Sequence, residues 1–301
     1  MIRFHRSKDC AKTVLFFLCI MLPAFAVLGE LASTMEMADQ EYDQRFLMKS
    51  DEPLQFLADY RSHIQAAIEL YEESSTGLSS LPVQSASHVL NRLSQLNYEF
   101  AKILILRNES QTQIIDHLLR GKGYGFRSLE LHAGFDRERF VDTLRYVTDP
   151  AALVWTANCW GSWLGYNPIE GFFNLSKVQK MYERAIAVDE EFWDGSALIG
   201  LGALLATTPS MMGGDTGQAR QHFERALRIA PSYLPISAVY AESYGFTHSF
   251  GARNGIRDSE LIEERLAFVE TTPAGKTRPF WNWEAKAESA LLRLELERFS
   301  R

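Results

Sequence analysis

Cysteine is scarce in this sequence. The chain has three cysteines, and Cys10 and Cys19 both lie in its N-terminal targeting segment, residues 1–29. If that segment is removed on export, Cys159 is left without a partner in the same chain. The sequence therefore excludes a framework of intramolecular disulfides in the mature protein.

The chain also lacks the signatures of several functional classes. It has no long lysine or arginine cluster, and its formal net charge is −7, which argues against a nucleic-acid partner. The histidines are scattered, with no cluster of His, Cys and Asp at metal-ligand spacing. No G-x-S-x-G elbow, H-E-x-x-H helix or dinucleotide fingerprint occurs. We therefore predict no nucleic-acid partner, no metal, no cofactor and no enzymatic activity.

One glycine-rich segment needs separate treatment. Residues 121–125 read GKGYG, which looks at first like a phosphate-binding loop. No strand pattern precedes it, and the Lys-Ser/Thr ending of a P-loop is absent. The segment is therefore predicted to be a turn between helices.

The N-terminus carries a targeting pattern. Basic residues precede an uncharged apolar run, TVLFFLCIMLPAFAVLG at 13–29, in which Ala24-Phe25-Ala26 offers a cleavage site. This pattern predicts a secretory signal peptide over residues 1–29. The alternative is an uncleaved inner-membrane anchor, because the run is just long enough to span a bilayer. Either reading predicts that the rest of the chain is exported to the periplasm.

Beyond this segment the sequence predicts an all-α fold. Residues 30–50 are polar and mixed, and they are expected to form a flexible leader. From residue 51 to 301, apolar residues recur at helical spacing and no stretch alternates like a strand. Early helices are expected to begin near residue 51, to run over 83–106, and to run over 108–120.

The second half of the chain is repetitive. Residues 216–244 have the alanine, phenylalanine and proline spacing of a tetratricopeptide repeat. Tyr182 begins YERAI and Phe223 begins FERAL, an offset of 223 − 182 = 41 residues. The offset aligns small residues expected at tight helix contacts, namely Cys159, Gly200 and Ala241 on first helices and Ala185, Ala226 and Ala267 on second helices. It predicts helical hairpins over about 151–190, 192–231 and 234–273, and a closing helix over 280–299.

The expected caps fit these boundaries. Ser176-x-x-Gln179 and Asp215-x-x-Gln218 both resemble capping boxes at helix starts. Gly213 and Gly214 before Asp215 are then a structural turn leading into an N-cap. The connections over 165–173 and 207–214 are expected to be long, and such connections often carry function.

Several segments together resemble the T-component proteins of tripartite ATP-independent periplasmic (TRAP) transporters. They are RGKGYGFRSL, LVWTANCWGSWL, the run from MYERAIAVDE through the GGD turn to HFERAL, and NWEAKAESALLRL. The resemblance implies an exported all-α protein built on tetratricopeptide-like hairpins, as an α-solenoid or closed helical array. It also implies association with a periplasmic solute-binding protein and a pore or cavity for a small hydrophobic solute, and it leaves a homo-oligomer open. Cys19 does not follow a small residue as a lipoprotein cysteine would, so we do not predict lipidation.

Aromatic residues on the first helices are the candidates for a cavity lining, because first helices line the concave side of such a stack. Each of them is also open to the interpretation that it packs in the core. A plain envelope scaffold, which binds a peptide or protein partner and has no solute pore, is the competing hypothesis. The candidate lining residues are Trp155, Cys159, Trp160, Trp163, Tyr166, Tyr240 and Tyr244.

Overall fold

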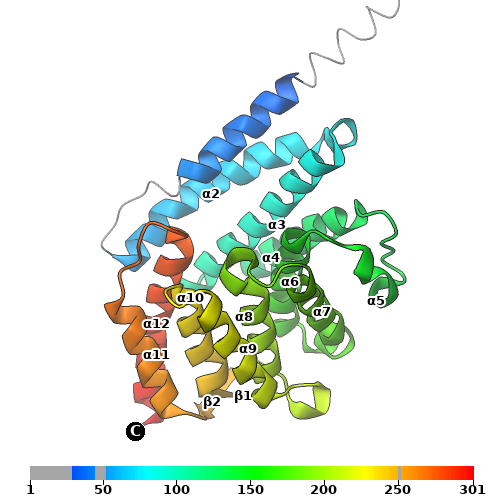
Figure 1. Ribbon diagram of the computed structural model, residues 1–301. Helices are drawn as coiled ribbons and strands as arrows, with labels where there is room; N and C mark the ends of the chain where they lie inside the picture. The colour runs from blue at the N-terminus through cyan, green and yellow to red at the C-terminus, as the bar shows by residue number, and fades with distance from the viewer. Residues whose placement is uncertain (1–28, 45–51, 250–251) are drawn as a thin grey trace, which may run out of the picture.

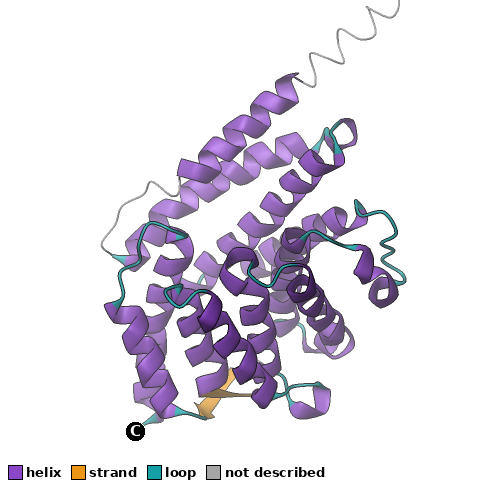
Figure 2. Cartoon of the chain, viewed as in Figure 1, coloured by secondary structure: helices purple, strands orange, loops and turns teal. Residues whose placement is uncertain are grey.

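The computed structural model describes residues 29–44, 52–249 and 252–301 of the protein. Almost every element in this part of the chain is a helix, and a single two-stranded hairpin is the exception (Figure 2). Neighbouring helices pack as antiparallel pairs along the chain (Figure 1). The prediction of an all-α fold is confirmed. The expected signal segment lies outside the described residues, apart from Gly29.

A helix stands where a flexible leader was expected. Residues 29–44 are helical, and Ala38 and Tyr42 on this helix are buried. The Gln95 side-chain amide donates to the Tyr42 hydroxyl over 2.9 Å, which ties the segment to a central helix. The expected leader is thus wrong for residues 30–44, because the apolar side of a polar-looking segment is covered by the rest of the fold.

The first half of the domain consists of long helices. They are α2 (Pro53–Ser75), α3 (Val83–Leu106) and α4 (Gln111–Glu130), with a 3-10 turn at Leu78–Ser80. A short helix, α5 (Phe140–Thr143), and a 3-10 turn at Leu144–Tyr146 lead to the repeats. Helix α3 packs against α2, α4 and α6 (Pro150–Gly165) and so lies in the middle of the molecule.

The GKGYG segment is not a turn but part of α4. A Cβ atom added to Gly121 would lie 2.5 Å from Cys159 Sγ, and one added to Gly125 would lie 2.1 Å from Thr156 Oγ1. These two glycines therefore let α4 and α6 approach closely, as in other helix pairs with small residues four positions apart. The prediction of a turn was wrong because tertiary contact outweighs the low helix propensity of glycine.

We expect Gly125→Ala to lower the free energy of unfolding by about 2 kcal/mol, since overpacking at this contact exceeds the gain in helix propensity. A Cβ atom added to Gly123 in the same helix would meet nothing within 4 Å. Gly123→Ala is therefore the matched control, and it should raise stability by up to about 1 kcal/mol. Urea unfolding of both variants measures the difference, and equal responses would contradict this account of the contact.

Helical hairpins follow one another after residue 150. The first consists of α6 and α7 (Pro168–Val188), and the second of α8 (Phe192–Thr207) and α9 (Thr216–Ile229). The third begins with α10 (Leu234–Tyr240) and a π-helical turn (Ala241–Gly245) and ends with α11 (Ser259–Thr271). Between them, β1 (Phe246–Ser249) and β2 (Ala252–Ile256) pair antiparallel, Phe246 opposite Ile256, with an irregularity after Thr247.

The third hairpin departs from the 41-residue register. Ala185 and Ala226 are fully buried at equivalent positions, but Ala267 is exposed and Leu266 is buried in its place. The π-turn and the β-hairpin replace the shorter connections of the earlier hairpins. Helix α11, the second helix of the third hairpin, therefore buries a different side. The alignment of Ala267 with Ala185 and Ala226 was therefore wrong.

The turn before α9 has the expected local chemistry. Gly213 adopts a left-handed φ of +97°, and a Cβ on Gly214 would lie 1.7 Å from the Thr208 carbonyl oxygen. The Asp215 carboxylate accepts from the Gln218 backbone N–H over 2.9 Å, and the Gln218 amide donates back over 2.8 Å. These residues shape a helix start.

The start of α7 was predicted incorrectly. The helix begins at Pro168, and its cap is the Asn167 side chain, which accepts from the Glu170 backbone N–H. Ser176 lies inside the helix and caps nothing. Pro168 fixes φ for a first helical turn, so the connection after α6 is much shorter than expected.

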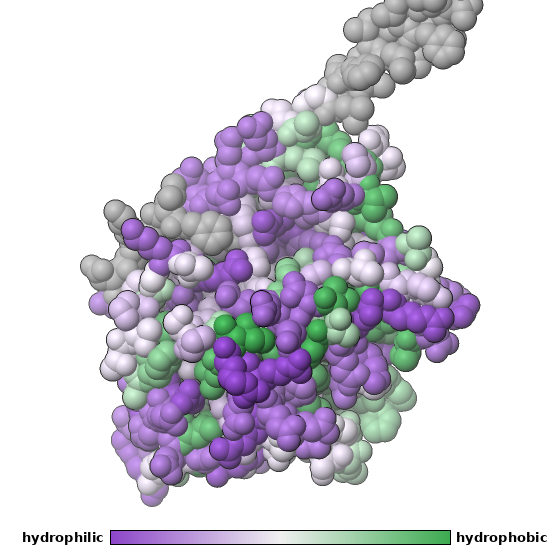
Figure 3. Space-filling view, in the orientation of Figure 1, coloured by the Kyte–Doolittle hydropathy of each residue, from purple (hydrophilic) through white to green (hydrophobic). Residues whose placement is uncertain are grey.

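The last helix closes the array onto its beginning. Helix α12 (Pro279–Phe299) packs against α10, α11, α2 and α3 (Figure 1). Phe280 stacks on Tyr60 with ring centroids 4.5 Å apart, and Trp283 stacks on Phe56 at 5.7 Å. On the face seen in Figure 3, apolar side chains lie near the middle and along the right side of a mostly polar surface.

Candidate functional site

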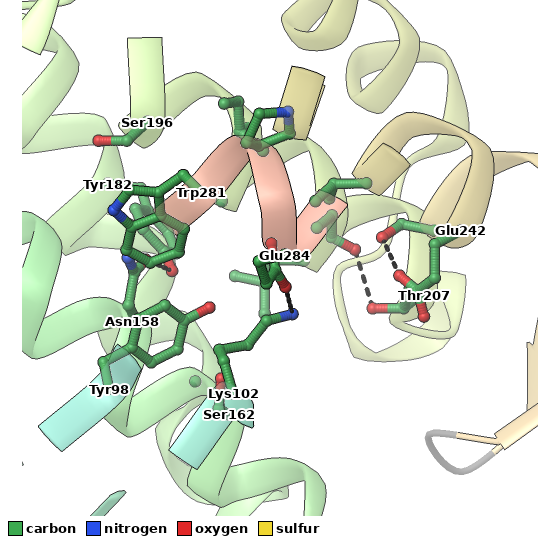
Figure 4. A pocket seen from close by; sticks show the side chains of 18 of the residues that line it. Tyr98, Lys102, Asn158, Ser162, Tyr182, Ser196, Thr207, Glu242, Trp281 and Glu284 are labelled. Atoms are coloured by element: carbon green, nitrogen blue, oxygen red, sulfur yellow. Dashed lines mark hydrogen bonds and ion pairs between the residues drawn. The ribbon is translucent and has the colours of Figure 1, made fainter. Parts of the chain in front are cut away.

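A cavity of about 360 Å³ lies between the first helices of the hairpins and helices α3 and α12. Its lining comes from α6, α8, α10 and the π-turn on one side and from α3 and α12 on the other (Figure 4). First helices therefore supply most of the lining, and Tyr182 from α7 and His248 from β1 complete it.

The lining positions follow the repeat register in the first two hairpins. Trp155 and Ser196 both line the cavity, an offset of 196 − 155 = 41 residues, as do Ser162 and Ala203. In the third hairpin the residue that follows Ser196 in this series is Val239, an offset of 239 − 196 = 43. Helix α10, the first helix of the third hairpin, is thus rotated about its axis relative to α6 and α8.

One wall of the cavity is aromatic. Trp155 lies edge-on to Trp193 with ring centroids 5.2 Å apart, and it stacks on Trp281 at 6.0 Å. Tyr98 from α3 stacks on the other side of Trp281 at 5.8 Å. Such rings bury a large apolar area and present flat faces to a solute.

Trp193 is held by an unusual backbone segment. Trp193 and Asp194 adopt left-handed φ values of 50° and 60°, and Gly195 continues the segment at 80°. The Arg278 guanidinium donates to Asp194 Oδ2 over 2.9 Å and lies 3.6 Å from the centre of the Trp193 ring. These contacts stabilise a conformation that non-glycine residues rarely adopt.

A charged group lies beside the aromatic wall. Lys102 Nζ is 2.8 Å from Glu284 Oε1 and 4.0 Å from Glu288 Oε2 (Figure 4). The Glu284 side chain is 3% exposed and that of Lys102 is 18% exposed. Burial alone would lower the pKa of Lys102, but Glu284 and then Glu288 raise it well above its ordinary value. Lys102 is therefore charged and paired.

The far end of the cavity holds Glu242 and His248. Arg253 Nη1 is 3.0 Å from Glu242 Oε1, and the Ser243 hydroxyl donates to Glu242 Oε2 over 2.7 Å. Burial acts to raise the pKa of Glu242, but the neighbouring His248 ring and the charge of Arg253 outweigh it and lower the pKa to about 2. Glu242 is therefore a carboxylate at neutral pH.

Most of this cavity wall coincides with a known family signature. A sequence model of the TRAP transporter T-component family matches residues 117–249, which include α6, α7, α8, α9 and α10. Over these residues the chain is similar to TRAP transporter T-components. The resemblance predicted from the sequence is confirmed, and the family implies an accessory role in a TRAP transporter. No curated protein matches the chain.

The T-component match covers less than the whole cavity. Trp281 and Glu284 on α12 and Tyr98 and Lys102 on α3 lie outside residues 117–249.

Over the described ranges, no helix has the length and apolarity needed to cross a membrane. Nor do those ranges contain a group of three His, Cys, Asp or Glu side chains that could hold a metal ion.

Of the candidates for the lining, Trp155 faces the cavity. Cys159 lies on the other side of α6, where its thiol donates to the Ser94 carbonyl oxygen over 3.4 Å. Burial raises the pKa of Cys159 to about 12, so it is an inert packing residue. A one-residue step along a helix turns a side chain by about 100°, which explains the difference from its neighbour Asn158 in the lining.

Trp160 and Trp163 line a second, outer hollow of about 210 Å³. Lys122 Nζ lies 4.0 Å from the centre of the Trp163 ring, and Trp160 packs edge-on against Phe126. Tyr166 is half-buried against the core at the end of α6. The structure therefore does not bring these rings to the central cavity.

Tyr240 and Tyr244 also lie away from the lining. Tyr240 stacks on Phe223 of α9 with ring centroids 4.5 Å apart, and the Arg257 guanidinium lies 5.2 Å from the centre of the Tyr244 ring. The two-residue change of register in the third hairpin places Val239 and Glu242 in the cavity instead.

The sequence reasoning missed several lining residues outside the candidate set. Trp193 lies in the left-handed segment at the start of α8, and Lys102, Glu284 and Trp281 come from helices that were expected only to flank the repeats. The α12 segment NWEAKAESALLRL was already part of the family resemblance. A glutamate on its apolar side was a signal that this helix buries a charge.

Proposed function

We propose that the chain is an exported accessory component of a TRAP-type transporter whose central cavity holds a small solute with a hydrophobic body. The cavity between the first helices carries this proposal, because its tryptophan wall offers apolar area, and Trp155 and Trp193 of this wall lie in the family-matched part of the fold. We further propose that it associates with a periplasmic solute-binding protein, and that residues 1–29 serve as its export signal or inner-membrane anchor.

The competing proposal is a tetratricopeptide-like envelope scaffold that binds a peptide or protein partner without transporting a solute. Its groove would have to stay open along the first helices. The packing of α12 against α10, α2 and α3 covers that side of the array and therefore favours a solute cavity.

We expect a neutral apolar dye, N-phenyl-1-naphthylamine, to bind the protein and to lose about tenfold or more in affinity in Ala203→Trp. Ala203 lines the cavity, so the indole fills space that the dye needs. Ala187 is exposed on α7, and Ala187→Trp is the matched control with unchanged binding. Dye fluorescence titration is the measurement, and equal affinity in both variants would exclude the cavity as the dye site.

Partner binding needs a separate experiment. Mild crosslinking in cells, followed by purification of this chain, should recover a periplasmic solute-binding protein. Its repeated absence would count against the transport proposal and favour the scaffold. Sequencing of the mature N-terminus would decide between the export signal and the anchor, because a chain that still begins near Met1 contradicts cleavage.

A further inference from the structure

Carboxylates outnumber cations around the polar part of the central cavity. Among the described residues, Glu242, Glu284, Glu288 and Glu295 form one cluster with two permanently charged cations, Lys102 and Arg253. Burial raises the pKa of Glu288 to about 7, so Glu288 carries only part of its charge at neutral pH, and the other three carboxylates still outnumber Lys102 and Arg253. Because buried charges are costly unless they are balanced, this cluster has room for one more positive charge.

His248 provides an independent sign of a missing partner. Its side chain is 3% exposed and lines the cavity, and neither ring nitrogen has a hydrogen-bond partner among the described residues. The Glu242 carboxylate is the nearest charged group, at 3.8 Å, which is beyond hydrogen-bond distance. A buried imidazole of this kind can accept a hydrogen bond from a solute, since buried polar groups are rarely left unpaired.

We propose that the solute is an apolar molecule bearing a protonated amine, with the amine between Glu242 and Glu284 and the body against the tryptophan wall. The inference rests on the proposed function, because it takes the cavity to be a solute site. Glu242 and Glu284 both line the cavity, and Thr207 lies beside Glu242 in Figure 4. An ammonium group there gains two carboxylates, a hydroxyl and an imidazole as acceptors.

An anionic head group fits this end poorly. Among the described lining residues the single lysine, Lys102, is already paired with Glu284 at 2.8 Å and has Glu288 nearby. Arg253 is likewise paired with Glu242 and Glu295. A carboxylate solute would therefore meet like charges at this end of the cavity.

The test compares three probes with the same alkyl chain: decylamine, decanol and decanoate. At pH 7 the amine is protonated and the acid is ionised, so the series varies the head group alone. Quenching or shift of tryptophan fluorescence reports binding beside Trp155, Trp193 and Trp281. We expect decylamine to bind about tenfold more tightly than decanol, and decanoate to bind most weakly.

One variant should change this ranking in a defined direction. Glu284→Gln keeps the shape of the side chain but leaves Lys102 without its closest counter-ion, so decanoate should gain affinity relative to decylamine. Glu260→Gln, at an exposed position on α11, is the matched control and should leave the ranking unchanged. Circular dichroism checks the fold of both variants, and the wild-type ranking tests the proposal even if Glu284→Gln does not fold.

The outcomes separate this inference from the proposed function. Tighter binding of decanoate than decylamine, or equal binding of all three probes, overturns the amine inference while the cavity still stands as an apolar solute site. Failure of all three probes to bind overturns both.

Discussion

Replacing Lys102 with methionine is expected to lower the free energy of unfolding by about 3 kcal/mol. Methionine approximates the volume of the lysine stem but leaves Glu284, whose side chain is 3% exposed, as a buried charge without its partner at 2.8 Å. This loss in free energy of unfolding lies at the lower end of the range usual for breaking a buried ion pair, because the Lys102 side chain is 18% exposed to solvent. Denaturant unfolding at pH 7 measures the effect.

A double variant shows whether the unpaired charge is the cause. Lys102→Met combined with Glu284→Leu removes both charges and should recover most of the lost stability, since apolar replacement of a buried pair is often tolerated. The matched control is Arg220→Met at the exposed pair with Glu224, where a change within about 0.5 kcal/mol is expected. If Lys102→Met and Arg220→Met lower the free energy of unfolding equally, the Lys102–Glu284 pair stabilises the fold no more than a surface pair does.

The second large effect is a loss of stability as pH rises from 4.5 to 7, caused by Glu288. Burial raises the pKa of Glu288, Glu284 and Glu242 raise it further, and Lys102 opposes them, with a result of about 7 against an ordinary value of 4.5. The folded protein therefore binds this proton more tightly than the unfolded chain. Its contribution is fully present below pH 4.5 and is lost as the pH rises through 7, by about 3 kcal/mol at most.

Glu288→Gln should remove this pH dependence. The variant is expected to gain stability relative to the wild type as the pH rises from 4.5 to 8. Burial lowers the pKa of His117 to about 4, which makes both proteins more stable as the pH rises to 6.5, so the difference between the two profiles reports Glu288. Glu242 does not interfere in this window, because its pKa is lowered to about 2 and its contribution is lost only in stronger acid. Thermal unfolding across the pH range measures the profiles, and parallel curves for both proteins would contradict the assignment to Glu288.

The site was predictable as far as the repeat register held. Trp155 was found as an aromatic residue on a first helix, where the cavity was expected, and the structure places Ser196 in the lining at the 41-residue spacing. Tyr240 and Tyr244 were expected to face the cavity as aromatic residues on the third first helix, but the lining of this helix is shifted by two positions, already at Val239 in α10. Trp160 and Cys159 were chosen by residue type, and the helix turns them away from the cavity.

The sequence by itself determined the all-α class, the family resemblance and the N-terminal cap at Asp215. These depend on residues close together in the chain, where helical periodicity and capping act locally. The tertiary structure alone decided that GKGYG continues a helix, that residues 29–44 join the core, and that Lys102 and Glu284 meet at the cavity. Each of these depends on contacts between residues far apart in the chain, with 284 − 102 = 182 residues separating the last pair. Local propensity carries no information about such a contact, and the energy of burying it outweighs the local preference.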